Sequence, residues 1–490
     1  MFEKVTPESV GIRSKDIIEY INYLTNRGVS VHDLLLIKGE KIYGEFYWAP
    51  FHKDFLHRQY SQTKSFVSIA IGLLEEEGKL SLDDKIYTYF PDKITSDIPN
   101  ELKEQTVRDM LMMETSIKSP NWFAANVTDR TAHYLNSPSK NYSSGMLWEY
   151  DSPGSQVLCA LVEKVSEMSL LDYLKQKLFD KMDCFKNAMI LKTPTGDSWG
   201  DSALLCTARD MASFGRFVMN YGVWNNERLM NEQYLKTATS PLVSNRLNSF
   251  YDPFFNGYGY QIWCTEQNGF AFNGMGGQFT ICLPEKNLIM VMNGDNQGYS
   301  SAYSIVINGY FDYIVNRASE KALDSNDDDY SKLEELKNTL KLASVQGEKS
   351  SKTFENVNGN EYKCDKNPME IESFSLNMDE NKGVFAYKNA QGHKEIKFGI
   401  NENIFGKFPQ YNYSNMVGNR PGENGYLYDC AASGAWMDDN KFMLRVQIID
   451  KYFGNLFVIF AFKDNKAAVK MIKNAEGFLQ EYDGIMTAEQ

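Results

Sequence analysis

The stretch "RQYSQTKSFVSIAIGLLEEEGKL", residues 58–80, predicts a core helix that carries two polar side chains at its start. Apolar residues run almost without interruption from Phe66 to Leu74, and Gly78 suits a left-handed cap at the end of the helix. Ser61 and Lys64 precede the apolar run at a spacing of three residues, which places both on one face of the first helical turn. A hydroxyl and an amine at the buried start of a helix indicate a functional site.

The Ser-x-x-Lys pair has the chemistry of an activated nucleophile. Lys64 Nζ can reach Ser61 Oγ, and apolar surroundings favour a neutral amine, which can act as a general base. The start of the helix adds free N–H groups and a positive field beside the hydroxyl. The same spacing also arises by chance at Ser137 and Lys140. The structural alternative is that Ser61 caps the helix and that Lys64 extends along the surface.

A second candidate segment is "LWEYDSPGSQVLCALVEKV", residues 147–165, in which Tyr150 and Ser152 stand just before another apolar helix. A phenol beside an ammonium group can have a lowered pKa and shuttle protons. The alternative for Tyr150 is a loop tyrosine packed on its ring, with its hydroxyl hydrogen-bonded.

A third candidate segment is "FNGMGGQF", residues 272–279. Gly274 and the glycines that follow it would let a ligand approach the backbone of a strand closely. The N–H of Met275 could then join the N–H of Ser61 in an oxyanion hole. The alternative is a bulge or a bend in an edge strand.

The pattern around these motifs predicts an α+β domain. Residues 33–48 predict two strands around a tight turn, residues 80–239 are mostly helical in pattern, and strands return over residues 258–296 before a last helix at 302–316. Strands at both ends of a domain favour one antiparallel sheet flanked by helices, here with a helical subdomain.

The length of 490 residues exceeds what one core usually supports, so we expect two domains. The first spans residues 1–318, a polar and charged linker with a short helix spans 319–352, and a smaller all-β domain spans 353–490. The strands of the last domain alternate like an antiparallel sheet or a small barrel. That domain packs over the first one, shapes its cleft or acts as a binding module.

The composition narrows the function. A net charge of −13 argues against nucleic acid and anionic membranes as partners. Seven cysteines without Cys-x-x-Cys spacing predict neither a zinc site nor a disulfide framework. No apolar run is long enough to span a bilayer, and the first residues lack the apolar core of a signal peptide, which favours a cytoplasmic protein. No histidine lies between residues 198 and 300, so a Ser-His-Asp triad is not favoured.

In these motifs, residues 6–316 resemble the serine β-lactamase and penicillin-recognising superfamily, in its class C-like branch, which also contains esterases, D-amino-acid peptidases and an oligoamide hydrolase. The matching segments occur in the order of the superfamily: "YSQTKSFVSIAIGLLEEEGKLSLDDKI", "EYDSPGSQVL" and "GMGGQF". The resemblance implies that Ser61 is the acylated nucleophile, Lys64 its partner base and Tyr150 the proton shuttle to the leaving group. It also implies hydrolysis of the acyl-enzyme.

Two positions depart from the pattern of the superfamily. Ser152 stands where many β-lactamases have asparagine, and Phe272-Asn273-Gly274 stands where Lys or His is followed by Thr and Gly. Without that cation the usual grip on a substrate carboxylate is lost, so β-lactam specificity is not expected. We expect Ser152, Asn273 and Gly274 to position the substrate, and Met275 to serve the oxyanion hole.

The expected function is hydrolysis of a small ester, amide or peptide through an acyl-Ser61 intermediate, without a metal or another cofactor. Two alternatives stay open. One is a penicillin-binding-like sensor that is acylated without efficient turnover. The other is a binding scaffold whose aromatic-rich β domain holds a sugar or a peptide.

Overall fold

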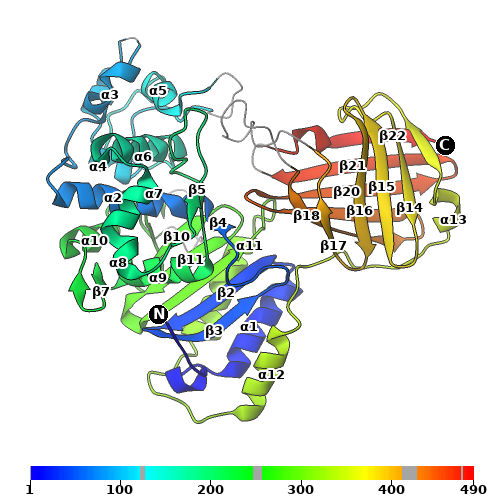
Figure 1. Ribbon diagram of the computed structural model, residues 1–490, viewed down its shortest axis with the longest axis horizontal. Coiled ribbons are helices and arrows are strands. Elements are labelled where there is room, and N and C mark those ends of the chain that lie inside the picture. Colours follow the sequence, from blue (N-terminus) through cyan, green and yellow to red (C-terminus); the bar gives the residue numbers. More distant parts are fainter. Residues whose placement is uncertain (1, 96, 122–126, 247–255, 411–426, 476–477) are drawn as a thin grey trace. The chain divides into compact units, whose positions relative to one another are not determined.

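The computed structural model describes residues 2–95, 97–121, 127–246, 256–410, 427–475 and 478–490 (Figure 1). The chain divides into two compact units, Met1–Lys341 and Leu342–Gln490. The segment 319–352, which the sequence predicts to be a linker, is shared between them. Its helix α12 (Asp327–Lys337) packs on α1 (Ser14–Asn26) of the first unit, with Leu333 buried in the core.

The first unit is built on a seven-stranded sheet in the order β1-β3-β2-β12-β11-β10-β9. Every neighbouring pair is antiparallel except β1 and β3. Strands from the two ends of the unit meet where β2 pairs with β12, as the sequence predicts. The bounds are β1 Glu3–Lys4, β2 Val31–Lys38, β3 Lys41–Tyr47, β9 Trp263–Cys264, β10 Phe270–Gly274, β11 Gln278–Leu283 and β12 Leu288–Gly294.

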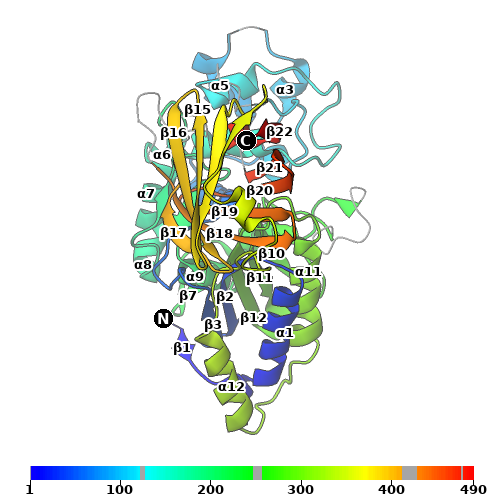
Figure 2. The same ribbon diagram turned by 90° about the vertical axis from the view of Figure 1, so that its right-hand side faces the viewer.

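Helices cover both faces of this sheet (Figures 1 and 2). Alternate residues of β2 supply two separate cores: Leu34 and Leu36 pack with α1, α11 (Ala302–Gly309) and the π-helical turn η8 (Tyr310–Val315). Leu35 and Ile37 pack with α2 (Thr63–Glu76), α9 (Ala208–Met219) and the helical subdomain. The remaining helices of the unit are α3 Asn100–Glu104, α4 Val107–Leu111, α5 Arg130–Leu135, α6 Ser152–Ser166, α7 Leu170–Leu174, α8 Asp180–Met182 and α10 Glu232–Ala238.

Helix α2 is the central element of the first unit. Every residue from Thr63 to Leu74 is buried, which is expected of a helix that is apolar all round. Gly72 makes room for a neighbouring helix, since a Cβ there would lie 2.5 Å from the ring of Tyr234 on α10. The helix ends before Gly78, whose φ of 68° gives the left-handed cap that the sequence predicts.

The second unit is all-β, which confirms the smaller C-terminal β domain that the sequence predicts. Nine strands follow the order β16-β15-β14-β13-β22-β21-β20-β19-β18, and a short parallel pairing of β16 with β18 closes them into a barrel, with β17 added beside β18. Buried aromatic rings such as Phe385, Trp436 and Phe460 fill the interior. The bounds are β13 Glu361–Cys364, β14 Ser373–Met378, β15 Lys382–Asn389, β16 Gly392–Ile400, β17 Ile404–Lys407, β18 Asp429–Asp438, β19 Lys441–Ile449, β20 Phe453–Lys463, β21 Lys466–Ala475 and β22 Gly484–Glu489.

In the parts of the chain that the structure describes, no helix combines the length and the apolar character needed to cross a membrane.

A buried acid in the sheet makes the stability of the first unit depend on pH. Asp33 on β2 faces Asn293 on β12, whose Nδ2 donates hydrogen bonds to both carboxylate oxygens at 2.9 and 3.0 Å. Burial raises the pKa of Asp33 to about 7, although these hydrogen bonds oppose the rise. Between the ordinary pKa of 3.8 and this value, the carboxyl ionises in the unfolded chain but stays protonated in the folded one. The native state therefore loses stability as the pH rises through this window.

Asp33→Asn removes this ionisation. Between pH 4 and pH 8 the free energy of unfolding of the variant should rise relative to that of the wild type, by about 4 kcal/mol at most, because only the wild type loses stability as the pH rises. Denaturant titrations at several pH values measure the difference, and the exposed Asp54→Asn is the control. A difference that stays constant over this pH range would contradict the account.

Candidate active site

Ser61 lies in a single 3-10 turn, η2 (Tyr60–Gln62), which leads directly into α2. Lys64 Nζ donates a hydrogen bond to Ser61 Oγ at 2.9 Å. Lys64 is 1% exposed, whereas Ser61 is half-buried. Tyr60 has a φ of 46°, a strained conformation for a bulky residue, and such strain is concentrated at functional sites. The turn thus directs a partly accessible hydroxyl at a buried amine.

Asp201 completes the surroundings of the amine. Lys64 Nζ donates to the backbone oxygen of Asp201 at 2.8 Å and lies 3.6 Å from its carboxylate Oδ2. Asp201 precedes β6 (Leu204–Cys206), which pairs with β4 (His57–Arg58) just ahead of Ser61. This pairing brings the acid to the amine. The sequence carries no motif that marks Asp201, so the sequence alone does not predict its contact with Lys64.

The ring of Tyr150 lies beside the amine of Lys64. The ring centroid lies 5.1 Å from Lys64 Nζ, which is a cation–π distance. Among the described residues, the Tyr150 hydroxyl makes no hydrogen bond to Ser61 or Lys64. The Tyr150 ring stacks on the ring of Trp263, on β9, with the centroids 5.6 Å apart and the two planes at 25° to each other. Ser61, Lys64 and Tyr150 are therefore neighbours, although the tyrosine is distant in sequence.

Asp151 fixes the backbone that follows Tyr150. Its carboxylate caps α6 by accepting from the N–H of Gly154 at 3.0 Å, and it is buried. It also accepts from three hydroxyls, at 2.8, 2.6 and 3.0 Å; these belong to Thr115, Ser119 and Tyr134. Burial, with the charge of Asp151, raises the pKa of Tyr134 far above its usual range.

Ser152 is the first residue of α6 and is half-buried. The described residues show no hydrogen bond between Ser152 and either Ser61 or Lys64. Ser152 lies beside Tyr150 and Asp151 in the sequence, and its role in positioning a substrate stays a prediction.

Strand β10 passes close to the turn η2 that carries Ser61. A Cβ on Gly274 would lie 2.3 Å from the backbone oxygen of Gln59, so only glycine allows this approach. The Met275 oxygen accepts from Gln278 Nε2 at 2.7 Å, whereas its N–H has no hydrogen-bond partner among the described residues. The N–H of Ser61 likewise has none there. Two adjoining backbone segments thus each offer a donor.

The turn after β10 is braced from α11. Tyr303 Oη donates to the oxygen of Gly274 at 3.2 Å and accepts from the N–H of Gly276 at 3.0 Å. Gly276 and Gly277 have φ values of 84° and 96°, which glycine adopts without strain. Asn273, on the same strand, is half-buried, and its Oδ1 has no hydrogen-bond partner among the described residues. The amide oxygen of Asn273 can therefore accept a hydrogen bond from a ligand.

The chain also contains one Gly-x-Ser-x-Gly pattern, residues 196–200, in which Ser198 would be the nucleophile. That pattern functions between a strand and a following helix, but this segment connects β5 (Met189–Ile190) to β6. Ser198 is buried, and its Oγ accepts a hydrogen bond from Lys192. The arrangement is that of a structural serine.

Within the described ranges, no group of three or more His, Cys, Asp or Glu side chains is placed to hold a metal ion.

Residues 25–299, more than half of the chain, match the family model described as Beta-lactamase. The chain belongs to the Beta-lactamase family. The superfamily resemblance that the three motifs carry is thereby confirmed. The curated relatives of this family member include the 6-aminohexanoate-dimer hydrolase of Paenarthrobacter ureafaciens. The two are 25% identical over an alignment of 277 residues, which covers 52% of this chain and 70% of the relative.

Solved structures agree on the fold. One is a Bacillus anthracis protein named provisionally as a 6-aminohexanoate-dimer hydrolase, with a TM-score of 0.52 and 18% identity over 64% of this chain and 86% of that one. Another is EstCE1, a hydrolase with promiscuous acyltransferase activity, with a TM-score of 0.50 and 13% identity over 61% and 98% of the two chains. At these identities the similarity shows the Beta-lactamase fold alone.

Proposed function

We propose that this Beta-lactamase family member is a serine hydrolase that cleaves a small ester or amide through an acyl-Ser61 intermediate. The observation that carries the proposal is the hydrogen bond of 2.9 Å between Lys64 Nζ and Ser61 Oγ. A buried amine in direct contact with a partly accessible hydroxyl is the arrangement of a nucleophile and its base.

The proposed reaction begins with a proton transfer inside this pair. Lys64 in its neutral form takes the proton of Ser61 as Oγ attacks the substrate carbonyl carbon, which reverses the direction of their hydrogen bond. The N–H groups of Ser61 and Met275 donate to the developing oxyanion. Asp201 holds Nζ in place through the two contacts at its oxygens.

The second half of the reaction releases the product. Tyr150 passes a proton to the leaving amine or alkoxide as its bond to the carbonyl carbon breaks, and the acyl group stays on Ser61. The protonated Lys64 then returns its proton to Tyr150, so that the amine is neutral again before deacylation. A water molecule then attacks the ester carbonyl, Lys64 accepts its proton, and the carboxylic acid leaves as Oγ regains a proton. The sum is one substrate and one water converted to an acid and an amine or alcohol.

The relatives support an ester or amide substrate. The 6-aminohexanoate-dimer hydrolase is named for hydrolysis of a dimer, and EstCE1 is a hydrolase that also transfers acyl groups. For this chain we propose weak activity on β-lactams. Phe272 is buried in the core and Asn273 is neutral, so neither supplies a cation for a substrate carboxylate.

The direct test replaces each member of the pair. We expect Ser61→Ala and Lys64→Ala each to lower kcat/KM for a p-nitrophenyl ester by about 1,000-fold or more, since each removes a group that acts as a unit with the other. Steady-state release of p-nitrophenol measures this loss. Ser137→Ala, in the chance Ser-x-x-Lys pair, is the matched control and should keep full activity.

Retention of activity in Ser61→Ala would overturn the proposal. A burst of product without steady release in the wild type would instead identify a penicillin-binding-like sensor. Complete inactivity of the wild type toward a broad set of esters and amides would favour a binding scaffold.

The role of Tyr150 makes a separate prediction. We expect Tyr150→Phe to lower kcat about 100-fold or more for an unactivated amide, because an amine must be protonated as it leaves. For a p-nitrophenyl ester the loss should be below about 10-fold, since p-nitrophenolate leaves without protonation. Parallel kinetics on the two substrates measure the contrast, and equal losses would remove Tyr150 from proton transfer.

A further inference from the structure

We propose that the segment Tyr260–Trp263 aligns Lys64 with Tyr150, and that Gln261 and Trp263 are positioning residues for the proposed reaction. This inference rests on the proposed function of Ser61, Lys64 and Tyr150. Neither residue belongs to a motif of the sequence. Gln261 acts through neighbours of the reacting groups, and Trp263 acts on the ring of Tyr150.

Gln261 is fully hydrogen-bonded in the interior. It is 2% exposed, and its Nε2 donates to the backbone oxygens of Met110 and Leu111 at 2.9 and 3.1 Å. Its own N–H donates to the oxygen of Leu111 at 2.9 Å. These three bonds fix the residue to helix α4.

The acceptors of Gln261 connect the two elements that carry the site. Ser65 Oγ, on the residue that follows Lys64, donates to the Gln261 backbone oxygen at 2.8 Å. Ser155 Oγ, in the first turn of α6, donates to Gln261 Oε1 at 2.7 Å. Ser155 Oγ also lies 3.1 Å from the backbone oxygen of Asp151, the residue after Tyr150. Gln261 therefore connects helix α2, which carries Lys64, to the start of α6, which follows Tyr150.

The backbone of Gln261 is strained. Its φ of 56° lies in the left-handed region, which residues other than glycine rarely adopt. Such a conformation persists where surrounding contacts determine it, and it occurs preferentially at functional sites. Here the five hydrogen bonds of Gln261 supply those contacts. If this conformation served only to reverse the direction of the chain, the residue would not need the hydrogen bonds of its side chain.

Trp263, two residues later, acts on Tyr150 directly. Its indole stacks on the tyrosine ring, with centroids 5.6 Å apart, while Trp148 packs edge-on against the indole at 5.7 Å. Trp263 lies on β9 and pairs with Ala271 of β10, the strand that leads to Met275. The stack therefore places the tyrosine ring relative to the strand that carries the proposed oxyanion donor.

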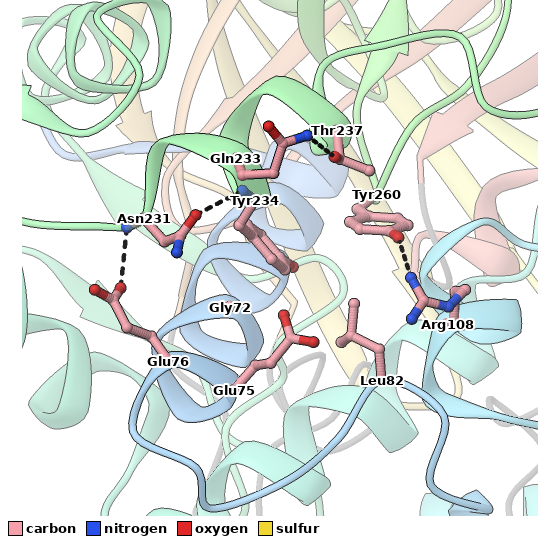
Figure 3. Close-up of a pocket in the computed structure, with 10 residues that line it drawn as sticks. All are labelled: Gly72, Glu75, Glu76, Leu82, Arg108, Asn231, Gln233, Tyr234, Thr237 and Tyr260. Carbon is pink, nitrogen blue, oxygen red and sulfur yellow. Dashed lines mark hydrogen bonds between the residues drawn. The ribbon is translucent and has the colours of Figure 1, made fainter.

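The start of the segment is anchored from α4. Figure 3 shows Tyr260 with its hydroxyl toward Arg108, whose Nη1 donates to it at 2.7 Å. The N–H of Tyr260 donates to the oxygen of Ala238 on α10, and the N–H of Gly259 donates to the oxygen of Ile262. A segment held at both ends and in the middle can transmit a fixed geometry to Tyr150. Displacements of about 1 Å at such groups are enough to lower rates strongly.

Gln261→Gly tests the role of the Gln261 side chain. Glycine keeps the left-handed backbone and the two backbone hydrogen bonds but removes the side-chain bonds to Ser155 and α4. We expect kcat for an unactivated amide to fall 10- to 100-fold with KM changed less than threefold, because positioning is lost and not binding. Gln447→Ala, at a buried hydrogen-bonded glutamine of the second unit, is the matched control and should keep wild-type kcat.

Trp263 is tested in two backgrounds. In the wild type, Trp263→Leu should lower kcat for the amide about 10-fold, and Trp263→Phe should restore most of it by renewing the stack. In Tyr150→Phe, which lacks the phenol, Trp263→Leu should cause less than a twofold further loss. A merely structural tryptophan would give the same factor in both backgrounds.

The outcomes separate the two proposals. Activity that survives in Ser61→Ala overturns the proposed function itself. If Ser61→Ala is inactive but Gln261→Gly and Trp263→Leu keep wild-type kcat, or if Trp263→Leu lowers kcat equally in both backgrounds, the positioning inference is wrong and the proposed function stands. Should Gln261→Gly fail to fold, the comparison of Trp263→Leu with Trp263→Phe in the two backgrounds decides alone.

Discussion

The buried amine of Lys64 determines which segments of the first unit must lie together around it. An ammonium or amine withdrawn from water must find polar partners, and here they are Ser61 Oγ and two oxygens of Asp201. To bring them together the chain needs a helix with an apolar circumference, a strained turn before it and the β4–β6 pairing beside it. The elements that form the core of the unit therefore also position the residues of the site.

The sheet brings a backbone N–H donor close to Ser61. Strands from both ends of the unit meet at β2 and β12, and β10 of the same sheet passes close to the turn that carries Ser61. Gly274 permits the close approach, and Tyr303 braces the turn that follows. An oxyanion hole built from the N–H groups of Ser61 and Met275 would therefore be pre-organised by the sheet and not by a flexible loop.

The sequence predicts the parts of this arrangement that depend on local spacing. The i, i+3 relation of Ser61 and Lys64, the apolar helix and the sheet built from both ends follow from residue patterns. Asp201 and Gln261 do not, because strand pairing and a left-handed backbone at a glutamine bring them into contact, and neither leaves a periodic signal. Helix α12 packs on α1 mainly through Leu333, too weak a pattern to distinguish it from a linker.

Acylation of Ser61 during turnover is the step on which the proposed reaction depends. Its most direct test is intact-mass spectrometry of the protein quenched during turnover of an ester, followed by peptide mapping. We expect an adduct of the mass of the acyl group on the peptide that contains Ser61. This adduct should decay as substrate is exhausted and be absent from Ser61→Ala. Turnover with an adduct on another residue, or an unchanged adduct in Ser61→Ala, would contradict it.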